Sequence, residues 1–171
     1  RLNTKVLNVL NHVDHVIANS NFTKDLAINL GVEEHRISVI NPGVDPVKEI
    51  PGKDLKKADE IFKGKKQRLI TVSRYDKRKN HEKVIMAIRN LKEVYPDIVY
   101  ICIGYGDEEE NLKKLVIELK LEDQVKFLKD IPSDFKNALI SKSNVFIMPS
   151  IIYKKSVEGF GIAYVEAAQY G

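Results

Sequence analysis

Residues 68–103 read RLITVSRYDKRKNHEKVIMAIRNLKEVYPDIVYICI, and this stretch decides the fold. Arg68–Ser73 predicts a strand, and apolar side chains at helical spacing predict a helix over about 80–95. Ile98–Ile103 is an almost uninterrupted apolar run, which is typical of a strand covered on both faces of a parallel sheet. A strand, a helix and a second strand in this order predict two parallel strands joined by a crossover helix.

Strand and helix patterns continue to alternate on both sides of this stretch. We therefore predict an α/β protein with a doubly wound, Rossmann-like parallel sheet that helices cover on both faces. Ligands of such sheets bind outside the carboxyl ends of the strands. The further predicted elements are a basic helix over about 53–63, a helix over 107–120, a strand over 124–128, a helix over 132–142, a strand over 144–148 and a helix near 160–170.

The N-terminal residues carry a shorter version of the same pattern. Predicted strands over 13–19 and 37–40 flank a helix that Ser20–Asn21 would cap and Gly31 would stop. The Pro-Gly turn in Asn41–Asp45 (NPGVD) and the polar residues after it predict a linker. Because the chain begins without methionine and stops in mid-pattern, we expect a cut fragment. Its predicted parts are residues 1–43 from one domain, a linker over 44–52, and a second domain over 53–171 that is truncated at its C-terminus.

Composition limits the classes of function. Of the 171 residues, 43% are hydrophobic and 30% are charged, and this composition supports a packed core rather than disorder. The net charge is +4, a mild excess of basic residues. Nucleic-acid-binding proteins cluster basic with aromatic residues, which this chain does not, so we expect no nucleic-acid partner. The one cysteine, Cys102, lies in an apolar run and predicts a buried thiol. No apolar run approaches the about 18 residues of a membrane span, so we expect a soluble chain.

A glycine-flanked turn lies between two glutamates in Ser156–Glu166 (SVEGFGIAYVE). Gly159 and Gly161 permit close approach of the backbone to a ligand. A helix that opens at about Phe160 would present unpaired N–H groups and a positive dipole end to a phosphate. Glu158 would repel phosphate there, so we assign it to sugar hydroxyls, whose hydrogen bonds a carboxylate accepts well. The alternative is an ordinary glycine turn before a helix, with two solvated glutamates.

A basic loop, Ser73–Asn80 (SRYDKRKN), follows the predicted strand over 68–73 and carries four cations in six consecutive positions. A guanidinium fork and a flexible ammonium together suit a diphosphate. A solvated basic loop is the alternative interpretation.

A tight turn, Gly104–Asp107 (GYGD), follows the buried strand over 98–103. A dinucleotide-binding fingerprint would need a further glycine at position 109. Glu109 stands there and disfavours a Rossmann-like oxidoreductase.

The histidines show no spacing suited to metal binding. His12 and His15 lie three residues apart without a nearby cysteine or third ligand, and the chain contains no Asp-x-Asp motif. We expect no metal site.

In this order, the motifs resemble those of a known family. The linker NPGVD, the basic loop, the Gly-x-Gly turn, the Pro149–Ser150 turn and the paired glutamates are similar to those of retaining glycosyltransferases of the GT-B fold, family-4 type (glycosyl transferases group 1). The resemblance covers almost the whole chain. It implies the C-terminal, donor-binding half of a GT-B architecture, with a remnant of the N-terminal acceptor domain in residues 1–43.

The resemblance also implies roles for particular residues. Arg74 and Lys79 match a family loop, Gly-Arg-x-x-x-x-Lys-Gly, that holds the donor diphosphate, although Ser and Asn replace its two glycines here. Glu158 would contact the donor hexose and Glu166 the ribose hydroxyls. The implied catalytic residues are Glu158, Arg74 and Lys79. The implied nucleotide-sugar-binding residues are Glu166, Gly159, Phe160, Gly161, Ile162, Gly104, Tyr105 and Lys129, the last three beside the base.

The implied reaction moves a hexose from a nucleoside diphosphate sugar to an acceptor hydroxyl with retention of configuration and without a cofactor. Whether Glu158 acts as a nucleophile stays open. A non-catalytic nucleotide- or phosphate-binding module remains the alternative, because fold does not fix function. The implied partners are the sugar donor and a saccharide or lipid-linked acceptor held by the missing domain, so we expect the fragment alone to be inactive. We expect a cytoplasmic location, and leave open peripheral membrane association of the full-length protein and self-association of the fragment.

Overall fold

The computed structural model describes residues 2–171, with side chains from Thr4 onward. The chain divides into two compact units. The first comprises the residues up to Asp45 together with Gly159–Ile162, and the second comprises Pro46–Glu158 and Ala163–Gly171. The sequence-based boundaries at residues 43 and 53 stay predictions.

A four-stranded parallel sheet forms the centre of the second unit. Its strands are β3 (Arg68–Val72), β4 (Val99–Ile103), β5 (Val125–Leu128) and β6 (Val145–Phe146), in the order β5-β4-β3-β6. Every neighbouring pair is parallel, and Ile70 of β3 pairs with Ile101 of β4 and Phe146 of β6. The predicted parallel sheet is confirmed.

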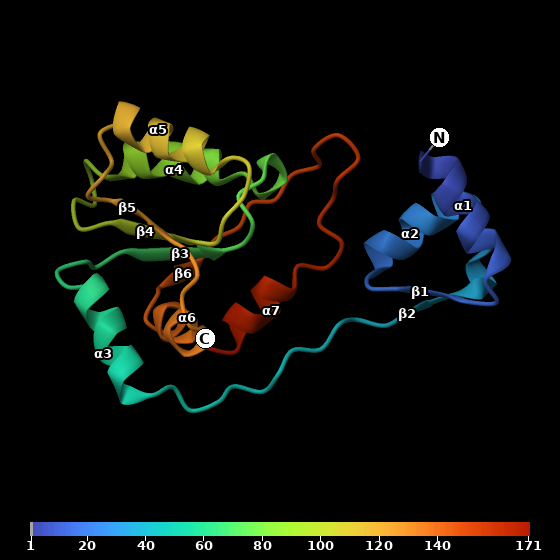
Figure 1. The fold of residues 1–171 in the computed structure, drawn as a ribbon, viewed down its shortest axis with the longest axis horizontal. Helices are drawn as coiled ribbons and strands as arrows, with labels where there is room; N and C mark the ends of the chain where they lie inside the picture. Colours follow the sequence, from blue (N-terminus) through green and yellow to red (C-terminus); the bar gives the residue numbers. More distant parts are fainter. Residues whose placement is uncertain (1) are drawn as a thin grey trace. The chain divides into compact units, whose positions relative to one another are not determined.

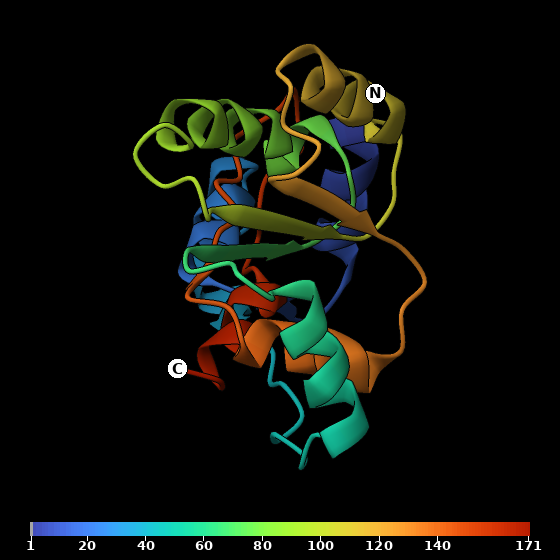
Figure 2. The same cartoon turned by 90° about the vertical axis from the view of Figure 1, so that its left-hand side faces the viewer.

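Helices cover both faces of this sheet. Figures 1 and 2 show α4 and α5 on one face, and α3 and α6 on the other. This two-sided cover is the doubly wound arrangement that the alternating pattern predicted. The helices of the second unit are α3 (Gly52–Ile61), the short 3₁₀ helix η2 (Lys77–Lys79), α4 (His81–Leu91), α5 (Glu109–Glu118), α6 (Ser133–Ser141) and α7 (Ile162–Ala168), whose first residue belongs to the first unit.

The side chains of β4 alternate between two apolar clusters. Tyr100 and Cys102 pack with apolar residues of α4 and α5, whereas Val99, Ile101 and Ile103 pack with those of α3 and α6. All five are buried, as expected for a central strand covered on both faces. The Cys102 thiol is free, and burial raises its pKa above the usual value. The prediction of a buried thiol is confirmed.

The carboxyl ends of the four parallel strands meet at one edge of the sheet. The loop Ser73–Asp76 follows β3, and Gly104–Gly106 follows β4. Lys129 follows β5, and Met148–Ser150 comes after β6. The sheet therefore brings these separate sequence motifs to the edge where ligands of such sheets bind.

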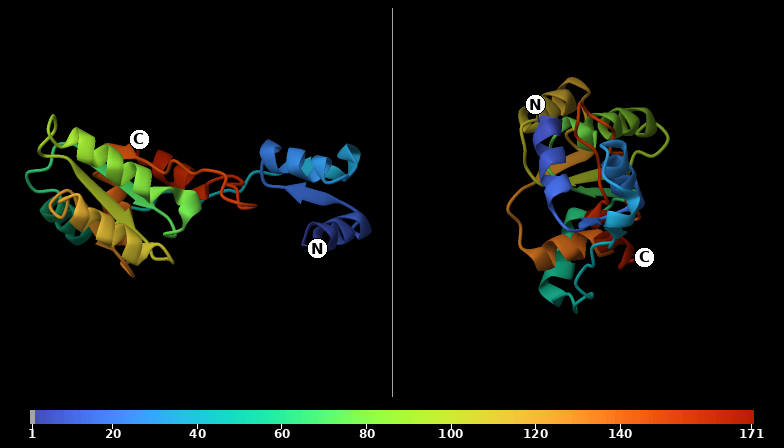
Figure 3. Two further views of the ribbon diagram at one scale, coloured as in Figure 1. Left: turned by 90° about the horizontal axis from the view of Figure 1, so that it is seen from above. Right: turned by 90° about the vertical axis from the view of Figure 1, so that its right-hand side faces the viewer.

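The first unit contains a parallel strand pair, β1 and β2, joined by α2. Ser20 caps α2 by accepting a hydrogen bond from the Thr23 amide at 3.1 Å, and Gly31, with φ of 99°, follows its end. Apolar residues of α1 and α2 pack against the strand pair, and Figure 3 shows the two helices beside it. The elements are α1 (Leu2–His12), β1 (Val16–Ala18), α2 (Asn21–Asn29), the 3₁₀ helix η1 (Glu34–Arg36) and β2 (Ile37–Val39).

The last predicted helix begins later than its sequence pattern indicates. We predicted a start at about Phe160, but α7 begins at Ile162. Gly161 has φ of 84°, which lies outside the right-handed helical region, so the helix can start only after it. None of the helices in residues 2–171 combines the length and the apolar composition needed to cross a membrane.

Candidate functional site

The basic loop after β3 is held in a compact 3₁₀ turn. The Asp76 carboxylate accepts a hydrogen bond from the Lys79 amide at 3.1 Å and so caps η2. Asn80 closes the turn with φ of 60° and donates its side-chain amide to the Pro149 carbonyl at 3.2 Å. The Ile151 amide donates to the Arg78 carbonyl at 2.8 Å. These bonds fix the backbone of the basic turn against the loop after β6.

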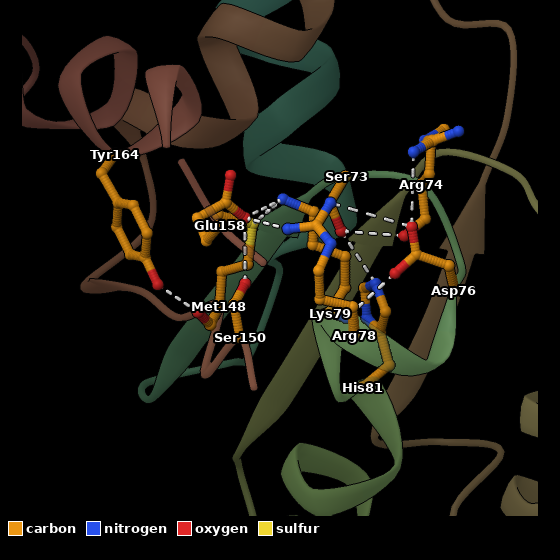
Figure 4. A network of polar contacts seen from close by, with 10 residues as sticks. All are labelled: Ser73, Arg74, Asp76, Arg78, Lys79, His81, Met148, Ser150, Glu158 and Tyr164. Atoms are coloured by element: carbon orange, nitrogen blue, oxygen red, sulfur yellow. Dashed lines mark hydrogen bonds and ion pairs between the residues drawn. The ribbon is translucent and has the colours of Figure 1, made fainter. Parts of the chain in front are cut away.

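The Glu158 carboxylate is the point where the polar side chains of this edge converge (Figure 4). Its Oε2 atom accepts hydrogen bonds from Arg78 Nη1 at 2.6 Å, from Ser150 Oγ at 3.1 Å and from Lys79 Nζ. The Lys79 ammonium also contacts Met148 Sδ at 3.4 Å. Within the described residues, Oε1 has no hydrogen-bond partner. One oxygen of Glu158 is therefore held by three groups, and the other is available to a hydroxyl.

The two cations on Glu158 are shielded from water. The side chain of Arg78 is 10% exposed and that of Lys79 is 11% exposed. Burial alone would raise the pKa of Glu158, but the hydrogen bonds and positive charges of Lys79 and Arg78 outweigh it and lower that pKa below its usual value. Glu158 is consequently ionised at neutral pH.

Arg78 is a residue of this cluster that our sequence reading did not assign. We chose Arg74 and Lys79 from the basic loop, yet the Arg74 side chain is 74% exposed and its nearest carboxylate is Asp76, at 3.6 Å. Figure 4 shows Arg74 pointing away from Glu158. The sequence indicated that the loop carries four cations, of which Arg78 is one. Which of the four face the Glu158 carboxylate is decided by the geometry of η2. The diphosphate role of Arg74 stays a prediction.

The Gly-x-Gly turn after β4 packs directly on the basic loop. A Cβ on Gly104 would lie 2.0 Å from the Ser73 carbonyl oxygen, and one on Gly106 would lie 2.4 Å from that of Tyr75. Backbone bonds join the two loops, from the Tyr75 amide to the Tyr105 carbonyl at 2.9 Å and from the Glu108 amide to the Tyr75 carbonyl at 3.0 Å. These glycines permit close packing of two loops. A ligand contact by Gly104 stays a prediction.

Tyr105 and Lys129, which we predicted beside a nucleotide base, lie together in the structure. The Tyr105 side chain is exposed, and Lys129 Nζ is 5.7 Å from the centroid of its ring. An exposed aromatic ring beside a cation offers a stacking surface to a planar ligand.

Glu166 lies on α7 and forms no ion pair with Arg78 or Lys79 in the part of the chain that the structure describes. Its nearest cationic partner is Lys136 of α6, at 3.8 Å, and its side chain is 39% exposed. Tyr164, two residues earlier, donates its hydroxyl to the Met148 carbonyl and so ties α7 to the loop after β6. Glu166 therefore sits on an anchored helix with a partly free carboxylate.

The predicted phosphate turn, Gly159–Ile162, groups with the first unit. The Ser20 hydroxyl donates to the Gly159 carbonyl at 2.5 Å. A Cβ on Gly159 would lie 3.2 Å from the Asn19 side chain, which is a tight contact that a small shift of that side chain would relieve. Gly161 needs its positive φ. The roles of Gly159, Phe160, Gly161 and Ile162 in binding phosphate stay predictions.

A buried chain of hydrogen bonds supports the start of the basic loop. His81 is 2% exposed and shares hydrogen bonds with Ser73 Oγ and the Tyr100 hydroxyl, each at 2.9 Å. The Tyr100 hydroxyl reaches Thr71 Oγ1 at 2.7 Å. Burial lowers the pKa of His81 to about 4, so its ring is neutral at physiological pH. Across residues 2–171, no three His, Cys, Asp or Glu side chains are grouped to hold a metal ion.

Comparison with known proteins identifies the family of the chain. A family model described as "Glycosyl transferases group 1" matches residues 52–171, and one described as "Glycosyltransferase Family 4" matches residues 1–48. The chain is 30% identical over 145 residues to the "Amylovoran biosynthesis glycosyltransferase AmsK" of Erwinia amylovora, covering 84% of this chain and 34% of that protein.

A further relative and a solved structure are also similar to the chain. The chain is 26% identical over 172 residues to the "GDP-mannose-dependent alpha-(1-6)-phosphatidylinositol monomannoside mannosyltransferase" of Mycolicibacterium smegmatis, covering 98% of this chain and 45% of that one. The structure of Anabaena HepE in complex with UDP-glucose superposes with a TM-score of 0.80 at 23% identity, over 98% of this chain and 46% of that one.

The likeness to HepE shows the fold, which is the Rossmann-like half of a GT-B architecture. The chain spans about a third to a half of the length of these relatives. The family model covers residues 52–171, which include the basic loop and both glutamates. The chain therefore belongs to the family of glycosyl transferases group 1.

Proposed function

We propose that this chain binds a nucleoside diphosphate sugar and serves the transfer of its hexose to an acceptor hydroxyl with retention of configuration. The observation that carries the proposal is the Glu158 carboxylate, held by two buried cations at the carboxyl edge of a parallel sheet. Such a site offers positive charge for a diphosphate and an oriented acceptor for sugar hydroxyls. The names of the relatives, all sugar transferases, support the same class of reaction.

The catalytic demand in this reaction is charge that develops on the leaving diphosphate. Lys79 and Arg74 would stabilise it. Glu158 would orient the hexose through Oε1, the oxygen without a partner among the described residues. Glu166 would accept hydrogen bonds from the ribose hydroxyls.

Isothermal titration calorimetry with UDP-glucose, GDP-mannose and ADP-glucose tests this proposal. We expect one of the three to bind, and we expect Lys79→Ala and Arg74→Ala to weaken that binding by about 1.5–3 kcal/mol each, the scale of a charge-assisted hydrogen bond. Lys77→Ala is the matched control, because Lys77 lies in the same loop but is exposed and has no ion pair among the described residues.

The outcomes separate the proposal from its alternative. Absence of binding to all three sugar nucleotides would contradict it. Binding of the bare nucleotide as tight as that of the sugar nucleotide, with no effect of Glu158→Gln, would favour a non-catalytic nucleotide-binding module.

We also propose that the 171-residue chain binds donor without transferring sugar. The chain spans 46% of HepE, and we place acceptor binding outside the described residues. Positioning of the two reactants can lower the activation barrier by about 7–11 kcal/mol, and without a positioned acceptor this effect is lost. Incubation with bound donor and a panel of saccharide and lipid-linked acceptors should therefore give no product. Turnover at about 1 s⁻¹ or faster, within the usual range of enzymes, would contradict this.

A further inference from the structure

Two cations from consecutive positions of the chain meet on a single carboxylate oxygen. Arg78 Nη1 lies 2.6 Å from Glu158 Oε2, and Lys79 donates to the same atom. A second carboxylate, Asp76, is 3.9 Å from Arg78 Nη2, but it already caps η2 and also faces Arg74. Glu158 therefore has one more cation than its own charge requires.

Stability does not explain the presence of Arg78 in this place. Its Nε atom is buried and has no hydrogen-bond partner among the described residues. A buried polar group without a partner is unfavourable, and buried ion pairs as a class contribute little net stability. The position of Arg78 is better explained by its effect on Glu158.

Binding of a diphosphate next to Glu158 poses an electrostatic problem. The ammonium of Lys79 is a flexible point charge that can turn from Glu158 to a phosphate. If it were the only cation on Glu158, that movement would leave a bare carboxylate beside the diphosphate. Arg78 differs from Lys79 because its planar guanidinium faces two carboxylates, with Nη1 2.6 Å from Glu158 and Nη2 3.9 Å from Asp76. The Lys79 ammonium pairs only with Glu158 among the described residues.

We propose that Arg78 is a positioning residue that keeps Glu158 oriented and neutralised when the donor diphosphate draws Lys79 away. With Oε2 retained by Arg78 and by the Ser150 hydroxyl, Oε1 stays directed at the hexose. This inference rests on the proposed function. Arg78 would remain bound to Glu158 throughout, whereas Lys79 would exchange between Glu158 and the diphosphate.

A double-mutant cycle with the sugar nucleotide that the wild-type chain binds tests the inference. Arg78→Met should weaken binding about tenfold or more, on the scale of coupling between charged groups in contact. In a Glu158→Gln background, the same substitution should change affinity less than about twofold, because the charge that Arg78 serves is gone. Lys77→Met removes the same charge from the neighbouring position and should change affinity less than about twofold in either background.

A measurement without ligand separates positioning from a general structural role. Carbon-13 NMR titration of the Glu158 carboxylate should show a higher pKa in Arg78→Met than in the wild type, and an unchanged pKa in Lys77→Met. Urea unfolding shows whether each variant is folded, and Arg78→Gln replaces Arg78→Met if the latter is not.

The possible failures are distinguishable. If the wild type binds none of the sugar nucleotides, the proposed function falls and this inference falls with it. If the wild type binds, but Arg78→Met has equal effects in both backgrounds or leaves the pKa of Glu158 unchanged, only the role of Arg78 is overturned.

Discussion

The basic loop after β3 and the Gly-x-Gly turn after β4 occupy equivalent places in the fold but make different kinds of contact. Each follows a strand of the same parallel sheet, and each resembles a ligand-binding turn in sequence. The basic loop buries two cations and directs them at Glu158. The glycine turn directs no charged group there, and instead packs its backbone against Ser73 and Tyr75. A turn at a strand end can thus present charged side chains or support a neighbouring loop through its backbone.

The largest expected effect comes from removing the close packing between these two loops. Gly104→Val places a Cβ 2.0 Å from the Ser73 carbonyl oxygen, at a backbone φ of 147° that side chains rarely adopt. We expect a loss of about 3–5 kcal/mol in the free energy of unfolding, as the sum of steric overlap and backbone strain. Urea denaturation followed by circular dichroism measures it.

Gly52→Ala is the control, because a Cβ on Gly52 meets nothing within 4 Å. It should change stability by less than about 1 kcal/mol, in the stabilising direction expected for alanine in a helix. A Gly104→Val variant as stable as the wild type would show that the two loops are not coupled by packing.

The next effect depends on pH and concerns the buried histidine next to the basic loop. His81 is hydrogen-bonded to Ser73 Oγ and to the Tyr100 hydroxyl of β4, and burial lowers its pKa from 6.5 to about 4. Between these values the unfolded chain binds a proton that the folded chain does not, so stability is full above pH 6.5 and falls as the pH drops towards 4. This shift corresponds to about 3 kcal/mol across that window.

Urea midpoints measured at about pH 7, 5.5 and 4 cover that window in even steps. As the pH is lowered, the midpoint should fall more steeply for the wild type than for His81→Gln. The difference between the two proteins isolates His81 from the carboxylates that titrate in the same range. Parallel curves would mean that the His81 ring is not buried in its neutral form.

Local sequence patterns were sufficient for the elements of the fold. The apolar run of β4 predicted a strand covered on both faces, and Ser20 and Gly31 marked the ends of α2. The site was less predictable because its contacts join distant residues. Nothing within the basic loop distinguishes Arg74 from Arg78, since the carboxylate that selects Arg78 lies 80 residues later. Likewise, the steric requirement for Gly104 comes from Ser73, on a different strand end.

The smallest expected effect sharpens the comparison by separating the two glutamates of the site. Glu158 is held by two cations and we propose that it orients the hexose, whereas Glu166 faces Lys136, at 3.8 Å, and we assign it to the ribose. Glu166→Gln keeps the shape of the side chain but exchanges a charged acceptor for a neutral one. Affinity for the nucleoside diphosphate should fall by about 1 kcal/mol, the difference between hydrogen bonds to charged and to neutral groups. Inorganic pyrophosphate, which has no ribose, should bind equally well to both proteins in the same calorimetric titration. Equal losses for the two ligands would make Glu166 a residue that supports α7 and would overturn its assignment to the ribose.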